Sequence, residues 1–422
     1  MSADRPSFSS QSDGATNSPP PFSVSDDTPT FDHVTPASHP LDPLTEEVAR
    51  ALAQPPPERT WIQSAVILAV SLVLFASAGF FSSTPTDLAL LVGVLFFHEL
   101  GHYLGMRLFN YQDVKMFFIP FFGAAVSGRS TSVEGYKEAI VLLLGPLPGI
   151  ILGGVLGVVC KFHDSAALGS AAMLLLAING FNLLPLLPLD GGRLVHLIVF
   201  SRQRHIEAFF RVATAVLLGL LAWAMGAWFL GIIAVFILLG TRMNYTISRL
   251  AQELRVFAAA VPAVNPTAAI PREWAIPLIE RVRAAFPAIK PPATLANLTR
   301  QVWERMHLRP PGLAASVLLL AVYAAGFLGA PIAAVLLHAP ITREVSRPQA
   351  DGSVIRTREV RSWGQLQKST ELGPDGFPNG RHVEYFRATD RPRIEGEYKD
   401  GEPSGVWTYY REDGQVESRR EY

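Results

Sequence analysis

Long apolar stretches, separated by short polar segments, dominate the middle of the chain. The first of them, WIQSAVILAVSLVLFASAGFF at residues 61–81, carries no charged side chain. Since about 20 apolar residues in a helix cross the hydrocarbon core of a bilayer, this stretch predicts a transmembrane helix. Comparable stretches lie at about residues 86–109, 138–159, 168–188, 207–240 and 312–337. The pattern therefore predicts an α-helical polytopic membrane protein with six to seven transmembrane helices.

Two features refine the number of spans and their orientation. The stretch at 207–240 is too long for one span, and AWAMGAW near its middle predicts a turn between two helices. Lys and Arg residues of the short loops fall on one side of the membrane if the N-terminus is cytoplasmic, which is the arrangement that charge statistics favour. We therefore expect a multi-pass protein of a bacterial-type inner membrane, with the N-terminus inside and, for seven spans, the C-terminal tail outside.

The remaining segments are more polar. Residues 1–60 are rich in Ser, Thr, Pro and Asp and are expected to be disordered, because they have too few apolar side chains to offset the entropy lost on ordering. Residues 251–310, with many prolines and basic side chains, predict a soluble linker or a small helical segment. Residues 311–338 add one more transmembrane helix, and a hydrophilic tail covers residues 339–422.

The overall composition excludes some classes of function. The 422 residues carry no formal net charge, whereas general nucleic-acid binding calls for a basic face, so we expect no nucleic-acid partner. The single cysteine, Cys160, excludes an internal disulfide and a cysteine-based zinc finger. It ends an apolar stretch, where a buried inert thiol is the simplest interpretation.

Three titratable residues interrupt the apolar stretch at 86–109. His98 and His102 are four residues apart, so a helix places both on one face, and Glu99 stands beside them. This H-E-x-x-H spacing is typical of two zinc ligands and a general base. The alternative, histidines that only pack between helices, leaves the cost of burying three titratable groups in lipid unexplained.

A catalytic zinc site normally has three protein ligands and an open position for water, so a third ligand is needed. Asp190 is the strongest candidate, because it follows an apolar run broken by Pro185 and Pro188 and precedes two glycines. Non-helical backbone at membrane depth is tolerated where it is buried in protein, and such a loop could carry a carboxylate to a metal on another helix. The alternative is that Asp190 caps a helix at the interface. Other titratable residues are expected to face head groups, solvent or the opposite side: Glu138, His163, Asp164, His196 and His205.

Two motifs together resemble one family. FFHELGHYLG at residues 96–105 and FNLLPLLPLDGG at residues 181–192 are similar to the motifs of the site-2 proteases, which are membrane-embedded zinc metalloproteases. The resemblance covers about residues 61–250. It implies a helical protease core that cleaves transmembrane segments of other membrane proteins, with Glu99 as the catalytic base. It also implies one zinc ion per chain with three ligands: His98, His102 and Asp190.

The resemblance further implies how a substrate would be held. Residues 110–136 are less apolar, with β-branched and aromatic side chains that favour short strands or a re-entrant loop. Within them, PFFGAAVSG at 120–128 is expected to form a strand-like element beside the site. Gly123 of this segment and Asn182 of the second motif are expected to position the substrate or the unwound loop.

The tail contains a weak repeat. HVEYFRATDRPRIEGEY and VWTYYREDGQVESRREY align at a spacing of 24 residues, which matches Tyr385 with Tyr409 and Tyr398 with Tyr422. The sequence EGEYKDGEPSGVWTYY resembles MORN-type repeats, also found in antitoxin-like proteins, in which short hairpins share an aromatic core. We expect a small β-rich module at about residues 379–422, with a protein partner as one use of it.

Two other functions remain open. A catalytically silent membrane scaffold or adaptor could keep the motifs for stability while its C-terminal repeats bind partner proteins, although such a protein would have no need of Glu99. A metal transporter would need several buried acidic or histidine residues along a path, and the sequence predicts one such cluster. The intramembrane zinc endopeptidase accounts for more of the residues than either alternative does.

Overall fold

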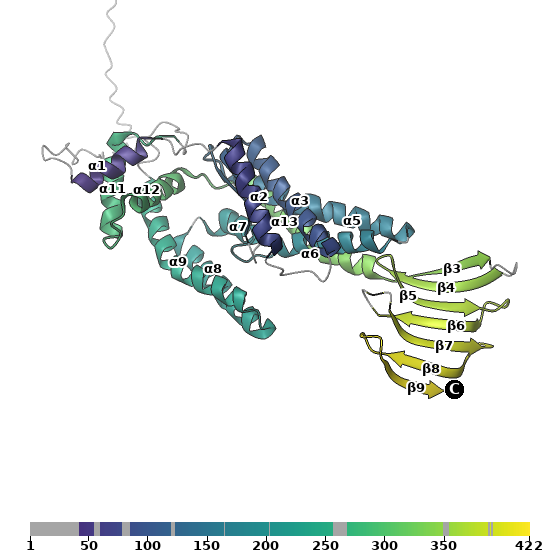
Figure 1. Cartoon of the computed structure of the whole chain (residues 1–422). Coiled ribbons are helices and arrows are strands. Elements are labelled where there is room, and N and C mark those ends of the chain that lie inside the picture. Colours follow the sequence, from purple (N-terminus) through teal and green to yellow (C-terminus); the bar gives the residue numbers. More distant parts are fainter. Residues whose placement is uncertain are drawn as a thin grey trace, which may run out of the picture.

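A helical part and a C-terminal sheet make up most of what the structure describes (Figure 1). The structure, a computed structural model, describes residues 42–54, 60–77, 85–119, 123–163, 165–201, 203–255, 268–348, 354–386, 389 and 391–422. Helix α13 runs from the helical part directly into the first strand of the sheet, so the two parts are continuous in the chain.

Six helices form the core of the helical part. Their bounds are α2 (Trp61–Ser77), α3 (Pro85–Leu108), α4 (Gly135–Leu144), α5 (Pro146–Phe162), α6 (Ala166–Asn182) and α13 (Leu313–His338). Helix α13 packs against α4, α5 and α6, and α3 packs against the same three helices. Leu143, Leu183 and Tyr323 are among the side chains buried where these helices meet. Helices α3, α4, α5, α6 and α13 each bury apolar side chains here, as the long apolar stretches of the sequence require.

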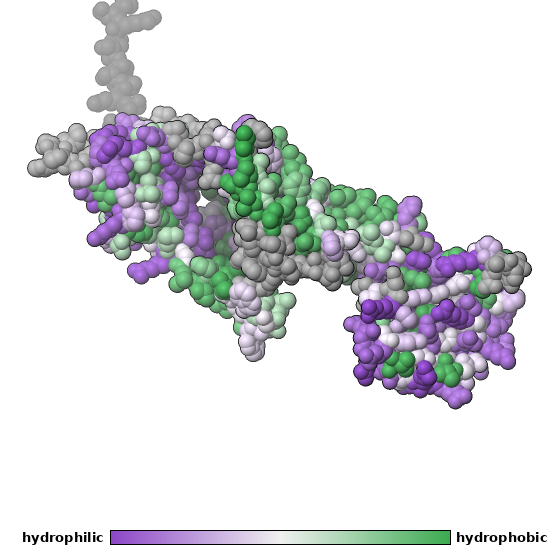
Figure 2. Space-filling model, viewed as in Figure 1, coloured by the Kyte–Doolittle hydropathy of each residue, from purple (hydrophilic) through white to green (hydrophobic). Residues whose placement is uncertain are grey.

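Five helical segments among the described residues are long and apolar enough to cross a membrane, if α4 and α5 are taken together as one: Pro85–Leu108, Gly135–Phe162, Arg204–Met225, Leu230–Glu253 and Leu313–His338. Two shorter apolar helices, Ile62–Val73 and Ala166–Asn182, correspond to the other two predicted spans. Large apolar side chains stay exposed on these helices, including Phe236 (70% exposed) and Val335 (72% exposed). Figure 2 shows extensive hydrophobic surface, in green, over the helical part. Exposed apolar surface of this extent is what helices facing lipid present.

A β-hairpin lies between the second and third predicted spans. Strands β1 (Gln112–Ile119) and β2 (Gly123–Arg129) pair antiparallel, with Phe117 opposite Ala125 and Ile119 opposite Gly123. Strand β1 packs on α2, and both strands pack on α3. In the described part of the chain, β2 pairs with no strand other than β1, so its second edge is available.

An unwound segment and a helical hairpin follow α6. The chain leaves the helix at Asn182 and re-enters helical structure in α7 (Asp190–Val195), which continues as the π-helix η2 (His196–Phe200). Helices α8 (Arg204–Met225) and α9 (Trp228–Glu253) then pack side by side. The turn between them falls within AWAMGAW, which confirms that the stretch at 207–240 forms two helices.

Three further helices pack on the C-terminal end of α9 and form what we call the helical cap: α1 (Pro43–Leu52), α11 (Arg272–Ala285) and α12 (Pro292–His307). Its core includes Leu52, Ile279 and Trp303, each at most 1% exposed. The expectation that residues 1–60 are disordered is therefore wrong for residues 43–52. Helix α1 alone has few apolar side chains, but α11 and α12 supply the surface that buries them.

The C-terminal sheet has seven strands in sequence order, each antiparallel to the next. They are β3 (Ile341–Pro348), β4 (Val354–Ser362), β5 (Gln365–Leu372), β6 (Pro378–Tyr385), β7 (Pro392–Lys399), β8 (Glu402–Tyr410) and β9 (Val416–Glu421). The β-module thus begins near residue 341 and not near 379. The rings of His382, Tyr398 and Trp407 pack together in β6–β8 at centroid distances of 5.2–5.3 Å. The repeat likeness itself remains a prediction.

The sheet is anchored at one end of the helical core. The β4–β5 turn places Trp363 against the end of α13, where its indole N–H donates to His338 Nδ1 over 3.0 Å. Ser362 Oγ donates to the carbonyl oxygen of His338 over 2.9 Å, and Arg343 of β3 donates to the carbonyl oxygen of Lys161 at the end of α5. The anchor therefore joins the C-terminal ends of α5 and α13 to the near end of the sheet.

Candidate metal centre

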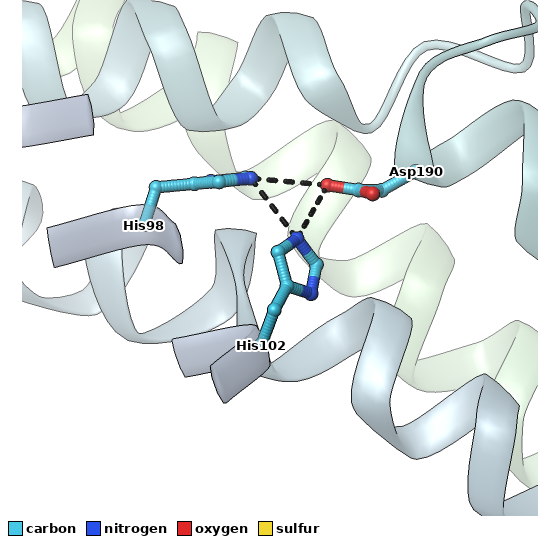
Figure 3. A group of neighbouring side chains, drawn as sticks. All are labelled: His98, His102 and Asp190. Atoms are coloured by element: carbon cyan, nitrogen blue, oxygen red, sulfur yellow. Dashed lines mark hydrogen bonds and ion pairs between the residues drawn. The ribbon is translucent and has the colours of Figure 1, made fainter. Parts of the chain in front are cut away.

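Three side chains from two distant segments meet inside the helical core (Figure 3). His98 and His102 lie on one face of α3 and are 3% and 7% exposed. Oδ2 of Asp190 lies 3.1 Å from Nε2 of His98 and 3.0 Å from Nε2 of His102. The two Nε2 atoms are 3.2 Å apart. Two imidazole nitrogens and one carboxylate oxygen therefore converge on a single point.

The unwound segment after α6 carries Asp190 to this point. The N-terminus of α7 folds back against residues 183–187, so closely that a Cβ on Gly191 would lie 2.2 Å from the carbonyl oxygen of Leu183. A Cβ on Gly192 would lie 2.3 Å from the carbonyl carbon of Leu186. The two glycines after Asp190 thus let the segment close on itself. The sequence interpretation of a non-helical loop agrees with the backbone of residues 183–189, whereas Asp190, Gly191 and Gly192 already belong to α7.

The Nδ1 atoms of both imidazoles also lie within hydrogen-bonding distance of oxygen atoms. Nδ1 of His102 lies 2.8 Å from the carbonyl oxygen of Val141 in α4. A carbonyl oxygen can only accept a hydrogen bond, so Nδ1 carries the proton and Nε2 keeps a lone pair for a metal. Nδ1 of His98 lies 2.8 Å from Oδ1 of Asn179 in α6. Metal-binding histidines usually have such partners.

The donor set fits zinc. The three ligand atoms lie within 4.8 Å of one another, and two imidazoles with one carboxylate are a common ligand set of catalytic zinc. Gly145, between α4 and α5, makes room for His102, since a Cβ there would lie 2.3 Å from its Nε2. The residues present can therefore hold one zinc ion and leave a position open.

Glu99 stands beside the three ligands and is 8% exposed. Its carboxylate lies within hydrogen-bonding reach of the backbone N–H of Val126 in β2. That N–H therefore points away from β1. Because alternate residues of a strand point their N–H and C=O groups to the same edge, Ala124 and Gly128 direct theirs to this edge too. The candidate base and the open edge of β2 thus face the same space.

That space is a cavity of about 770 Å³. The metal cluster and Glu99 line it, together with Ala125, Val126 and Gly128 of β2. Glu304, Arg305 and Leu308, in and just after α12, line it from the helical cap. Burial raises the pKa of Glu304, although the nearby Arg300 opposes this shift. The cavity is large enough for a short stretch of polypeptide.

The two residues expected to position a substrate have different surroundings. Asn182 lines the cavity, and its Nδ2 donates to the carbonyl oxygen of Ile178 over 3.1 Å. Gly123 begins β2 opposite Ile119, and Ala125, Val126 and Gly128 of the same strand line the cavity. The structure thus brings Asn182 to the cavity, while the roles of both residues stay predictions.

The other titratable residues are dispersed. His163 is exposed at the end of α5, and Asp164 lies outside the described residues. Glu138 lines the cavity, 3.9 Å from Arg193. The ring of His205 packs near that of Tyr245, with the centroids 5.6 Å apart.

His196 does not simply face head groups or solvent, as the sequence suggested. Its Nε2 lies 3.0 Å from Oε1 of Glu207, which is 4% exposed. Arg211 and Arg305 lie 3.3 and 3.4 Å from the same oxygen, and Ser248 Oγ donates to Oε2 over 2.7 Å. A buried carboxylate needs such partners, and α8 folds back on η2 and α12 to provide them. Sequence analysis missed this network because nothing local joins its members.

Part of the chain is similar in sequence to known proteins. No model of a protein family matches the chain. The chain is 31% identical over 116 residues to the zinc metalloprotease MJ0392 of Methanocaldococcus jannaschii, covering 26% of this chain and 33% of that protein. It is 30% identical over 133 residues to stage IV sporulation protein FB of Bacillus subtilis, covering 31% of this chain and 46% of that protein.

Among solved structures, the site-2 protease from Methanocaldococcus jannaschii matches with 21% identity and a TM-score of 0.32, covering 43% of this chain and 88% of that one. The chain thus spans a third to a half of the length of the two curated relatives. Over about a quarter to a third of its own length, it is similar to a protein named as a zinc metalloprotease and to a sporulation protein.

Proposed function

We propose that this protein is a zinc-dependent intramembrane endopeptidase of the site-2 protease family, which cleaves transmembrane segments of other membrane proteins. The observation that carries the proposal is the convergence of His98, His102 and Asp190 within 3.2 Å of one another, with Glu99 beside them. Two of these ligands and Glu99 lie on a helix apolar enough to cross a membrane. Buried titratable groups in such a helix are costly unless they serve a site of this kind.

The residues divide the chemistry between them. A bound zinc ion supplies Lewis-acid polarisation of the scissile carbonyl and activation of water. His98, His102 and Asp190 would hold the ion, and the single carboxylate would offset part of its charge in a site of low dielectric. Glu99 accepts the proton of the attacking water at its carboxylate. It then passes that proton to the nitrogen of the leaving amine.

The edge of β2 would hold the substrate. A peptide bond inside a helix is protected by the helical hydrogen bonds, so the substrate must unwind before it can be cut. An extended segment can pair with the outward-facing backbone groups of Val126 and its alternate neighbours, which lie next to Glu99. Asn182 also lines the cavity, and in this proposal it contacts the same segment. This arrangement presents a peptide bond to the metal cluster by main-chain contacts, without demanding one sequence.

The ends of α13 support an arrangement across the bilayer. This helix has 26 residues, and at 1.5 Å per residue it is about 39 Å long, enough to cross. Just before its N-terminal end, the backbone of Arg309 pairs with Val133 and Gly135 near the cavity, and its C-terminal end meets the sheet. We therefore place the helical cap and the N-terminus on the cytoplasmic side of an inner membrane and the sheet on the other side. There the sheet is free to contact a partner protein.

Replacement of Glu99 by Gln tests the proposal even while the substrate is unidentified. Cells that produce wild-type protein, Glu99→Gln or the control Glu134→Gln are compared by membrane proteomics. Glu134 also lines the cavity, but its side chain is 44% exposed and pairs with Lys137. We expect a single-span protein to accumulate uncut only with Glu99→Gln, and the purified variant to keep its zinc. Identical membrane proteomes for wild type and Glu99→Gln would favour the silent scaffold.

A further inference from the structure

Asn179 is buried completely and contacts a residue of the metal cluster. Its side chain is 0% exposed, one turn before Asn182 on α6. Oδ1 of Asn179 lies 2.8 Å from Nδ1 of His98, the ring nitrogen that does not face Asp190. A fully buried amide would be costly if its polar atoms had no partners. The contact with His98 therefore offsets the cost of burying the oxygen of this amide.

The second hydrogen bond of Asn179 fixes which atom faces His98. Nδ2 donates to the carbonyl oxygen of Leu175, one turn earlier in α6, over 2.7 Å. The amide is thereby oriented with its oxygen toward the imidazole. An amide oxygen only accepts hydrogen bonds, so Nδ1 of His98 carries the proton and Nε2 presents its lone pair to the metal.

A glycine on a neighbouring helix leaves the space for this amide. Gly149 of α5 lies against Asn179, and a Cβ there would come within 2.2 Å of Nδ2 and 2.5 Å of Oδ1. The amide thus sits in a slot between α3, α5 and α6 that fits a planar group.

We propose that Asn179 is a positioning residue that sets the tautomer and the ring orientation of the metal ligand His98. The inference rests on the proposed zinc site. Asn182 has no such role, since its Nδ2 donates to Ile178 and its side chain lines the cavity. The imidazole of His102 is oriented in the same way by a hydrogen bond from its Nδ1 to the backbone carbonyl oxygen of Val141, so one imidazole is held by a side chain and the other by the backbone.

The test measures zinc affinity of the purified full-length protein by competition with a chelator. Asn179→Leu keeps the branched shape, with methyl groups in place of the oxygen and NH2 group, but removes the acceptor, and the variant is expected to bind zinc about 10- to 100-fold more weakly than wild type. Asn179→Asp restores an acceptor, and its affinity is expected to stay within about threefold of wild type, because carboxylates are common partners of zinc-bound histidines. Asn182→Leu, the same change one turn away, is the control and should leave zinc affinity unchanged. A role in helix packing alone predicts the opposite, with Leu tolerated better than Asp.

Two results would overturn the inference, and they are distinct from failure of the proposed function. Wild-type zinc affinity in Asn179→Leu would remove Asn179 from the site while leaving the protease proposal intact. If Asn179→Leu does not fold, Gly149→Ala decides, because the added Cβ displaces the same amide; unchanged affinity in that variant would also contradict the inference. The absence of zinc binding in the wild type would instead remove the proposed function itself.

Discussion

Gly145→Ala should damage the metal centre without touching any ligand. A Cβ at this position would lie 2.3 Å from Nε2 and 2.4 Å from Cε1 of His102. Since carbon and nitrogen atoms pack no closer than about 3.4 Å, the imidazole must move by about 1 Å or α5 must shift away from α3. Either response stretches the 2.8 Å hydrogen bond to Val141 or the 3.0 Å approach to Asp190. Metal–ligand distances tolerate only about 0.2 Å, so zinc affinity should fall at least about tenfold.

The assay compares zinc affinity and thermal unfolding of the wild type, Gly145→Ala and Gly154→Ala. Gly154 lies in α5, the helix that follows Gly145, and a Cβ there meets no atom within 4 Å, so this variant makes the same chemical change in open space. We expect Gly154→Ala to match the wild type in zinc affinity and Gly145→Ala to lose it, with both proteins folded. Equal affinity in all three would mean that His102 is not a ligand or that its position is not confined as the structure describes.

Two further predictions concern parts of the protein away from the metal centre. Trp303→Ala should destabilise the helical cap by about 3–5 kcal/mol, because it removes the largest side chain from the core of the cap, and hydrogen exchange of α11 and α12 should accelerate. The control Gln301→Ala changes an exposed side chain of the same helix and should leave the exchange rates unchanged. Exchange in Trp303→Ala as slow as in the wild type would contradict the assigned core. Burial, with a smaller contribution from Lys368, lowers the pKa of His382, so the folded sheet favours the neutral ring and loses stability as the pH falls below the ordinary value of about 6.5. Protection of the β6–β8 backbone amides from hydrogen exchange, corrected for the intrinsic pH dependence of exchange, should therefore fall from pH 7.5 to pH 5 in the wild type and fall less in His382→Gln. The same pH dependence of protection in both proteins would exclude His382 as the cause.

Most of the helical core could be predicted because apolar stretches of membrane length leave little choice of structure. The helical cap could not be predicted in the same way. Helix α1 has only a few apolar positions, among them Val48 and Leu52, and these are buried by helices more than 200 residues later in the chain. Such packing is a property of the folded chain and has no local signal.

The metal cluster could be predicted from the sequence because its residues stand in two short segments whose patterns can each be recognised locally. The spacing of His98 and His102 sets their common face, and the prolines and glycines around Asp190 mark a loop that can cross between helices. Asn179 and Glu207 gave no such signal. An asparagine in an apolar helix and a glutamate near a helix start have many uses, and only the contacts of the folded chain reveal theirs.

In the tail, the aromatic pattern marked only part of the sheet. Trp407 and Tyr398 belong to the repeat and lie in the ring cluster around His382. Strands β3 and β4 contain no aromatic residues and instead mix charged residues, such as Arg358 and Glu359, with Ser, Thr, Val and Ile, so the sequence did not mark them as strands of the same module.

The most direct measurement of the central claim is the position of the cut in a substrate. The protein that accumulates with Glu99→Gln is reconstituted with wild-type enzyme in lipid vesicles, and the products are identified by mass spectrometry. The account predicts a cut inside the apolar segment of the substrate, lost on zinc chelation and restored by added zinc. A cut confined to the soluble part, or cleavage that persists without zinc, would contradict it.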